Sequence, residues 1–370
     1  MTKEKDTSRF KKPEKRRKIH FSSNPRYERI LHHLWKFRYL CVHHLGVLLY
    51  LDEKQERLTY KQSIRRSESI VNIRGISKNL NGLWQNNYIA KRHILTKGVT
   101  QMGTEKDIWS LDKKGAELLV EKTGLFLDDI AYPPLPKISA PHGGEPMGEW
   151  NFLKHHILIS DVLVSFHAFS YLQDAYQVLF FTVDKKIEEK FSIVLDGKEK
   201  WHGIRPDGFI ILEEKSTKKR INLFLEIDRK TERLGYFTQK LEGYYAFQNS
   251  GKQKAFLEKL YNENFETLGE PKEEFLKNAR VLTITTSDIR AKNMAKATFP
   301  LFHNGKGSKM FYYTTDSYFQ LSQRKEFVSK ITGNTYAKSI VSFDEIPKIG
   351  QSIWYAGHQD YQLQKVQIFG

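Results

Sequence analysis

The chain has 370 residues, which is more than one ordinary small domain needs and predicts two or three domains. Hydrophobic residues make up 39% and charged residues 28%, a composition that excludes wholesale disorder. No apolar run reaches the length of a membrane span, and the first 20 residues lack the apolar block of a secretory signal. Because Cys41 is the only cysteine, an internal disulfide framework and a cysteine-based zinc site are excluded.

Charge is the strongest signal in the composition. Sixty Lys and Arg residues against 43 Asp and Glu residues give a net charge of +17, which favours a polyanionic partner, most commonly a nucleic acid. Residues 1–22 are expected to form a disordered basic arm, with nine Lys and Arg residues in the first 20 positions. Such an arm either lies on phosphates or is a solvated tail that keeps the protein soluble.

Residues 23–122 follow the order helix, helix, helix, hairpin, helix. Apolar residues recur at helical spacing in the first three helices. Two short strands, at 88–92 and 107–111, flank a turn-rich tip, and a further helix starts at Lys113. This order, and the segment from Ile76 to Leu119 in particular, resembles a winged helix-turn-helix.

The outer face of the third predicted helix carries polar side chains that suit the major groove of DNA and offer donors to base edges. Cations on the hairpin would reach the flanking phosphates. The alternative is a winged helix that binds another protein, in which the polar helix face is only exposed to solvent. The predicted DNA-binding residues are Arg74, Ser77, Lys78, Asn81 and Gln85 on the helix and Lys91, Arg92 and Lys97 on the hairpin.

A composition change separates this module from the rest of the chain. Residues 123–148 hold five of the 11 prolines and the pair Gly143-Gly144, which predicts an interdomain linker. Residues 149–345 alternate strands and helices, so we expect an α/β fold (α+β overall) with a mixed sheet, followed by a C-terminal extension at 346–370. The last 40 residues are expected to add an irregular strand or two. The expected elements are helices at 150–172, 234–247 and 289–298 and strands at 178–183, 209–212, 223–228, 280–285 and 310–314.

Three acidic residues lie at the ends of two neighbouring predicted strands. Asp207 precedes one strand, and Glu226 and Asp228 end the next. Alternate residues of a strand share a face, so Glu226 and Asp228 point the same way, and a hairpin would place Asp207 beside them. Converging carboxylates repel one another unless a divalent cation neutralises them, and oxygen ligands favour Mg²⁺ or Mn²⁺. Acidic residues also gather at strand ends by chance.

The segment Pro206-Asp207, followed by a hairpin that ends in Glu226, resembles the PD-(D/E)xK nuclease superfamily. Asp228 occupies the position of that motif's lysine. Some members of the superfamily take the lysine from the following helix, which implies Lys240 here, with Lys230 as a second candidate. The resemblance implies a restriction-endonuclease-like domain behind the winged helix.

Taken together, several features are similar to the replication-relaxation family, which includes plasmid relaxases of the C mobilisation class. They are the winged helix, the Pro-rich linker, a histidine at the start of the next helix, Pro-Asp-Gly, the segment Leu225 to Glu232, and Lys240-Leu-x-x-Tyr244. The resemblance spans residues 26–320. The family's histidine corresponds to His155, although Ser160 stands where the family often has Asn.

The resemblance implies a DNA-binding enzyme that nicks at a plasmid or mobile-element origin for replication or conjugative mobilisation. Asp207, Glu226 and Asp228 would hold the cation, which polarises the scissile phosphate. Lys240 would stabilise negative charge on the phosphate oxygens, and His155 would act as a general acid or base or orient the DNA. Tyr244 and Tyr245 are interpreted as core or rim aromatics rather than nucleophiles.

Two alternatives stay open. One is a winged-helix replication or transcription regulator with a degenerate nuclease-like domain, which the missing lysine at position 228 favours. The other is a restriction-type endonuclease that makes double-strand breaks as a homodimer. The expected partners are double-stranded DNA and single-stranded DNA at a nick, with no membrane partner. The expected location is the cytoplasm of a bacterium.

Overall fold

The structure is a computed structural model, and the chain folds into two compact units. The first unit comprises Met1–Leu49 and Asn72–Trp150, and the second comprises Tyr50–Val71 and Asn151–Gly370. The residues that the structure describes are 19–21, 24–59, 73–93, 107–130, 147–172, 175–183, 188–195, 198–229, 234–269, 271–301, 310–319, 322–328, 335–341, 354–357 and 363–366. Most of the predicted linker and all of the predicted arm before residue 19 lie outside them, so the predicted domain boundaries stay predictions.

The first unit combines helices with a three-stranded antiparallel sheet of order β1-β3-β2. Helix α1 forms because apolar residues recur every three or four positions, and Ile30, Leu31 and Leu34 are fully buried. The order of elements is the expected one, and the assignment as a winged helix-turn-helix stays a prediction. The elements are α1 (Arg26–Phe37), β1 (Leu40–Cys41), α2 (Val42–Thr59, of which the part from Tyr50 is assigned to the second unit), α3 (Ile73–Gln85), β2 (Ile89–His93), β3 (Asp107–Leu111), α4 (Lys113–Thr123) and η2 (Leu127–Asp129).

Helix α4 packs so closely on the start of β2 that its third residue must be glycine. A Cβ at Gly115 would lie 2.2 Å from the carbonyl oxygen of Tyr88 and 2.9 Å from the side chain of Leu111. We expect Gly115→Ala to lower the free energy of unfolding by about 2 kcal/mol, because a backbone oxygen cannot move aside without shifting the strand. Urea unfolding monitored by circular dichroism measures this.

Gly75→Ala is the matched control, because nothing lies within 4 Å of a Cβ added at Gly75 in α3. That substitution should leave the unfolding midpoint unchanged or raise the free energy of unfolding by up to about 1 kcal/mol. Equal midpoints for the two variants would show that α4 does not need the close approach.

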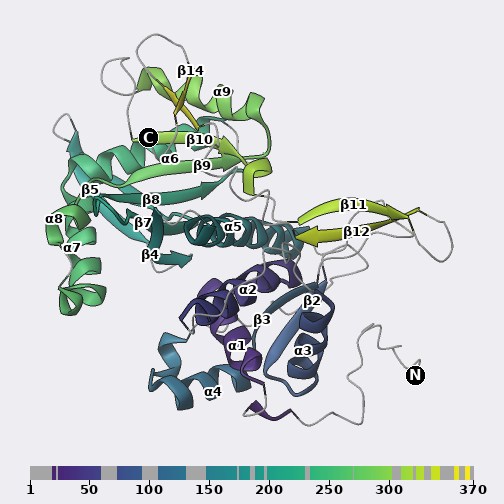
Figure 1. The fold of residues 1–370 in the computed structure, drawn as a ribbon. Helices are drawn as coiled ribbons and strands as arrows, with labels where there is room; N and C mark the ends of the chain where they lie inside the picture. Colours follow the sequence, from purple (N-terminus) through teal and green to yellow (C-terminus); the bar gives the residue numbers. More distant parts are fainter. Residues whose placement is uncertain are drawn as a thin grey trace, which may run out of the picture. The chain divides into compact units, whose positions relative to one another are not determined.

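The second unit is built on a seven-stranded mixed sheet of order β14-β13-β10-β9-β8-β7-β4 (Figure 1). Strands β8, β9 and β10 run parallel, and the other pairs of neighbours in this sheet run antiparallel. The helices are α5 (Met147–Leu172), α6 (Leu234–Asn249), α7 (Lys252–Asn264), α8 (Lys272–Phe275) and α9 (Asp288–Thr298), with 3-10 turns η3 (Glu266–Leu268), η4 (Phe299–Leu301) and η6 (Asp316–Phe319). The strands are β4 (Tyr176–Val183), β5 (Glu189–Leu195), β6 (Lys198–Ile204), β7 (Gly208–Glu214), β8 (Arg220–Ile227), β9 (Arg280–Thr285), β10 (Phe311–Thr315), β11 (Ser322–Val328), β12 (Thr335–Val341), β13 (Trp354–Gly357) and β14 (Leu363–Val366).

Helices cover both faces of the sheet, which explains why its central strands read as continuous apolar runs. On one face Phe209 and Phe224 pack with α6, α7 and α9 in a single core cluster. On the other face α5 contributes His167, whose ring lies 4.9 Å from that of Phe181, and Ser165, which donates to the carbonyl of Phe319. The α/β fold class predicted from the sequence is confirmed.

Strands β5, β6 and β11 and helices α7 and α8 were not expected from the sequence. Strands β5 and β6 form a separate antiparallel hairpin, and β6 packs on α6. The segment 346–370, expected as an extension, supplies β13 and β14, which continue the main sheet beyond β10. In the described part of the chain, we find no helix with both the length and the apolar character to cross a membrane.

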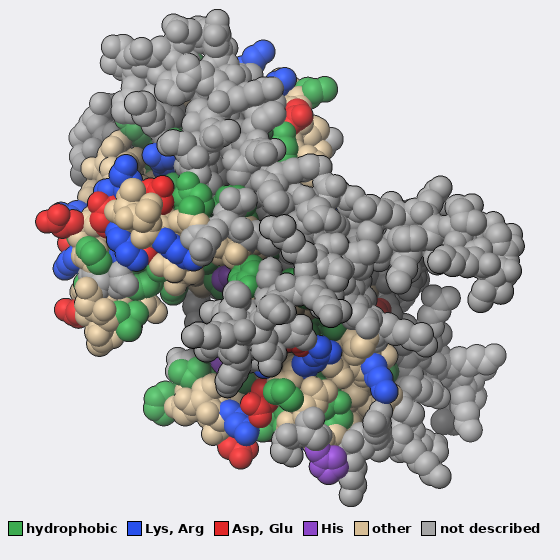
Figure 2. All heavy atoms as spheres, viewed as in Figure 1, with side chains coloured by type: hydrophobic (Ala, Val, Ile, Leu, Met, Phe, Trp, Pro, Cys, Tyr) green, Lys and Arg blue, Asp and Glu red, His purple; other side chains and the backbone are tan. Residues whose placement is uncertain are grey.

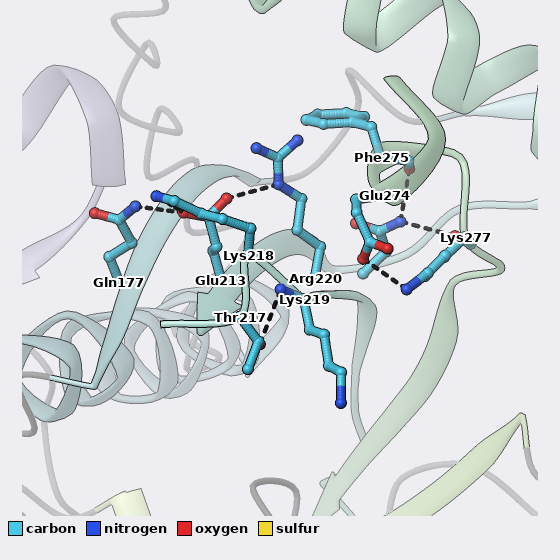
Figure 3. A network of polar contacts seen from close by, with 10 residues as sticks. Gln177, Glu213, Thr217, Lys218, Lys219, Arg220, Glu274, Phe275 and Lys277 are labelled. Atoms are coloured by element: carbon cyan, nitrogen blue, oxygen red, sulfur yellow. Dashed lines mark hydrogen bonds and ion pairs between the residues drawn. The ribbon is translucent and has the colours of Figure 1, made fainter. Parts of the chain in front are cut away.

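The hairpin β7–β8 carries a buried ion pair near its turn (Figure 3). Arg220 Nε donates to Glu213 Oε2 at 2.8 Å, and both side chains are almost completely buried. Gln177 and Lys218 both donate to the other carboxylate oxygen, at 2.7 and 3.0 Å. The Arg220 guanidinium also lies 5.3 Å from the ring centroid of Phe275. Because the carboxylate is satisfied from several sides, its charge is tolerated in the interior.

Charge on the described surface is mixed. On the face drawn in Figure 2, the coloured Lys and Arg side chains are interspersed with Asp and Glu. The net positive charge of the chain is therefore not segregated into one patch among the described residues of this face.

Candidate active site

Two of the predicted acidic residues meet at the end of the β7–β8 pair that is opposite its turn. Gly208 lies opposite Leu225, so Asp207 and Glu226 follow next to each other at the end of the ladder. The backbone N–H of Asp207 donates to the carbonyl of Leu225 at 2.9 Å, and Asp207 Oδ2 accepts from the N–H of Ile227 at 2.7 Å. The Glu226 carboxyl group lies on the face of β8 that carries Phe224 and packs against α6, because side chains alternate along a strand. Asp207 lies in the bend just before β7, at the end of the sheet.

Helix α5 brings a histidine to this point. His155 Nε2 lies 2.8 Å from Asp207 Oδ1, and the two side chains are 27% and 19% exposed. The neighbouring His156 is buried, with its ring 4.3 Å from that of Phe152. Of the two adjacent histidines, His155 is therefore the one that contacts the acidic pair.

Helix α6 supplies a lysine and a tyrosine to Glu226. Lys240 and Tyr244 are one helical turn apart and reach the same carboxylate, with Lys240 Nζ on Oε2 and the Tyr244 hydroxyl donating to Oε1. The helix faces the sheet because Phe237 and Leu241, on the same side, are buried in the core cluster. Glu226 is 2% exposed and Tyr244 is fully buried, whereas 29% of the Lys240 side chain is exposed.

The two carboxyl groups have opposite pKa shifts. Burial raises the pKa of Glu226 to about 7, and the charge of Asp207 adds to that effect while Lys240 and Tyr244 oppose it. Burial also acts to raise the pKa of Asp207, but His155, Lys240 and the Ile227 N–H outweigh it, so the pKa lies below its usual value. Two acids with separated pKa values beside a lysine and a histidine are typical of catalytic centres.

The third predicted acidic residue departs from the expectation. Asp228 lies on the same face as Glu226, but both of its carboxylate oxygens bind Arg290 of α9, and Oδ2 also accepts from the Thr285 hydroxyl at 2.7 Å. Within the described ranges there is no group of three or more His, Cys, Asp or Glu side chains arranged to hold a metal ion. The geometry thus gathers Asp207 and Glu226 as a pair and directs Asp228 to an arginine.

This pair fits a hard divalent cation by its chemistry. Magnesium in phosphate-processing sites is commonly held by one or two carboxylates, with waters and substrate oxygens completing the shell. Repulsion between Asp207 and Glu226 contributes to the raised pKa of Glu226, and a cation between them would relieve that repulsion. Asp207 and Glu226 are therefore the residues that could hold Mg²⁺ or Mn²⁺.

A comparison with known protein families shows the family of the chain. The sequence profile described as replication-relaxation matches residues 31–258. The chain belongs to the replication-relaxation family. The family implies interaction with DNA at a replication origin and suggests a role in plasmid replication or mobilisation. A search of curated proteins and a search of solved structures each found no match.

In this replication-relaxation protein, the structure brings together four residues of the matched segment: Asp207, Glu226, Lys240 and His155. Asp228 also lies in the matched segment, but it binds Arg290 instead. Lys230, the second lysine candidate, lies outside the described residues. The catalytic roles of these residues stay predictions.

The polar face predicted for DNA lies on α3. Lys78 and Asn81 are exposed, and Ser77 and Gln85 are half-buried. The side chain of Arg74 and the whole of Lys97 lie outside what the structure describes. The DNA-binding role of this face stays a prediction for the replication-relaxation protein.

On the hairpin, the structure places the Lys91 side chain differently from the prediction that the hairpin cations contact phosphates. Lys91 Nζ lies 2.8 Å from Asp107 on the neighbouring strand and 5.1 Å from the ring centroid of Trp109, and its side chain is 13% exposed. Arg92 is half-buried. Lys91 therefore stabilises the hairpin itself, which local charge in the sequence could not indicate.

Sequence reasoning missed two functional candidates in the replication-relaxation protein. The contact of Tyr244 with Glu226 could have been expected, because Tyr244 follows Lys240 by one helical turn. Arg290 is 62 positions from Asp228 and 32 beyond the family match, and no spacing signal connects them.

Proposed function

We propose that this protein is a Mg²⁺- or Mn²⁺-dependent phosphodiesterase that nicks DNA at a plasmid or mobile-element origin. The observation that carries the proposal is the carboxylate pair Asp207 and Glu226 with Lys240 against Glu226 and His155 against Asp207. A cation, two acids, a lysine and a proton-transfer group are the parts that phosphodiester cleavage needs.

Each residue has a role that follows from its surroundings. Asp207 and Glu226 would hold the cation, which when bound lowers the pKa of water and polarises a phosphate oxygen. Lys240 places a partly exposed positive charge where negative charge develops on the phosphate. The Asp207 carboxylate, whose pKa is lowered, would accept a hydrogen bond from Nε2–H of His155, and Nδ1 would then be the ring nitrogen that acts as the base.

We assign DNA selection to the first unit. The polar side chains of α3, among them Lys78 and Asn81, would read base edges, as the winged-helix resemblance implies. The catalytic residues all belong to the second unit. Binding and cleavage should therefore be separable by substitution.

Plasmid nicking tests the proposal. Supercoiled plasmid carrying the cognate origin should become open circular with the wild-type protein and Mn²⁺, and it should stay supercoiled with EDTA or with Asp207→Asn. A plasmid without the origin is the specificity control. If Asp207→Asn nicks as fast as the wild-type protein, the proposed centre is wrong.

One observation favours the alternative of a non-catalytic regulator. Lys240 and Tyr244 already satisfy both oxygens of Glu226, so the carboxylate is neutralised without a cation. A regulator of this kind would bind origin DNA but show no affinity for Mn²⁺. Isothermal titration with Mn²⁺ separates the two functions.

The affinity for Mn²⁺ should depend on pH through Glu226. Its pKa is raised to about 7, so below that pH the carboxyl group is mostly protonated and the cation must displace the proton. We expect the Mn²⁺ affinity to fall about tenfold per unit as the pH drops below 7 and to level off above it. Isothermal titration across this range measures the dependence.

Glu226→Gln is the control for this pH dependence, because the amide cannot ionise. Its weak residual affinity should not change near pH 7, since the lowered pKa of Asp207 keeps that group ionised. A wild-type affinity that stays constant through this range would contradict the assignment.

A further inference from the structure

The structure contains a second arginine–carboxylate pair, between Asp228 just after β8 and Arg290 of α9, and it differs from the pair of Arg220 and Glu213. Arg220 and Glu213 near the β7–β8 turn are 0% and 1% exposed, as expected of a pair that only stabilises the interior. Arg290 and Asp228 lie just past the opposite end of β8, and 23% of the Arg290 side chain is exposed while Asp228 is 3% exposed. One edge of this pair is therefore accessible to a ligand.

Several contacts fix Arg290 in place. Its Nε and Nη2 bind the two oxygens of Asp228, with Nη2 to Oδ1 at 2.8 Å, and Thr285 donates to Oδ2 at 2.7 Å. The backbone N–H of Asp228 donates to the carbonyl of Ile284 at 2.8 Å, which extends the β8–β9 ladder to this point. A bidentate pair of this type orients the planar guanidinium more strictly than a single contact does.

The position of Arg290 is that of a ligand-binding residue. It follows the carboxyl ends of the parallel strands β8 and β9, where ligands bind in open α/β sheets. Asp228 is two residues from Glu226 and on the same face of β8, so Arg290 is anchored beside the proposed centre. A partly exposed guanidinium there suits the phosphates of a DNA strand that passes Glu226.

We propose that Arg290 binds a backbone phosphodiester of DNA and that Asp228 is its positioning residue rather than a metal ligand. The proposal rests on the proposed function for the identity of the ligand as DNA. It assigns a role to a residue outside the segment that the replication-relaxation profile matches.

Two measurements on the full chain test the proposal. The first is Mn²⁺ affinity by isothermal titration: Asp228→Asn should retain it within about twofold, whereas Glu226→Gln should lose it. The second is binding to a labelled origin duplex in EDTA at several KCl concentrations. Arg290→Gln should lower the slope of log affinity against log salt by about 0.9, the value for one lost phosphate contact.

Matched variants separate a phosphate contact from a structural effect. Lys296→Gln removes the same charge from the exposed face of α9, about two turns further along, and should leave the slope unchanged. Arg290→Lys retains the charge and should keep most of the salt slope. This variant also provides a test if Arg290→Gln fails to fold. Asp228→Asn combined with Arg290→Gln should bind DNA no more weakly than Arg290→Gln alone.

Distinct results overturn the parts of the proposal. If Asp228→Asn weakens Mn²⁺ binding as much as Glu226→Gln, Asp228 is a metal ligand. If Arg290→Gln keeps the wild-type salt slope, the pair is only structural. If the wild-type protein binds no Mn²⁺, the proposed enzyme function fails, and the DNA measurement still decides the role of Arg290.

Discussion

Glu226→Gln should reduce plasmid nicking by about a thousandfold or more, because it removes the charge that would hold the cation while it retains the size of the side chain. Glutamine can still accept a hydrogen bond from Tyr244, so the fold around α6 should persist. Affinity for origin DNA should change by less than about threefold, since Glu226 is buried and the bases are assigned to the first unit. Single-turnover nicking and DNA binding measure the two effects.

Glu263→Gln on α7 is the matched control, because the same chemical change is made at an exposed position. It should nick at the wild-type rate. Nicking by Glu226→Gln within tenfold of the wild-type rate would mean that the carboxylate is not part of the catalytic centre.

The largest loss of stability should come from breaking the ion pair near the β7–β8 turn. Arg220→Ala leaves the Glu213 carboxylate buried without its closest cation and should lower the free energy of unfolding by about 3–5 kcal/mol. Lys218→Ala removes a cation that is 56% exposed from the same carboxylate and should cost less than about 1 kcal/mol. Denaturant unfolding of the three proteins measures the difference.

A double substitution separates the buried charge from the lost packing. Glu213→Leu with Arg220→Met removes both charges and retains apolar volume, so it should recover most of the stability that Arg220→Ala loses. If Arg220→Ala unfolds at the same denaturant concentration as Lys218→Ala, the pair does not contribute as its burial indicates.

The acidic pair was predictable because it depends on local rules. Alternation along β8 puts Glu226 on the face of Phe224, and an antiparallel hairpin with a short turn brings the start of β7 to the end of β8. Lys240 was predicted from the resemblance to nucleases that take the lysine from the helix after the strand, and α6 brings it to Glu226. The buried apolar runs of β7 and β8 made these elements clear in the sequence.

The pairing of Asp228 with an arginine was not predictable. Its partner Arg290 is brought by α9, which follows three further helices and another strand, and only the parallel pairing of β8 with β9 places the two together. The same holds for Lys91, whose partner Asp107 lies across the hairpin. Tertiary partners decide whether a charged side chain faces solvent, and residue spacing does not encode them.

Elements that were missed, or expected without defined bounds, have different causes. The sequence between β5 and β6 contains Asp-Gly, a strong hairpin signal, but charged residues interrupt the alternation along β6. Strands β13 and β14 are only four residues long and lie at one edge of the sheet, where they are too short for a period-two pattern. The place of β13 is set by pairing with β10, which is distant in the sequence, and β14 pairs with β13.

Anomalous scattering from crystals of the protein soaked in Mn²⁺ tests the account most directly. We predict a peak within bonding distance of the Asp207 and Glu226 carboxylates, with Lys240 displaced from Glu226 and Arg290 still bound to Asp228. A peak coordinated by Asp228 in place of Arg290, or no peak at saturating Mn²⁺, would contradict it.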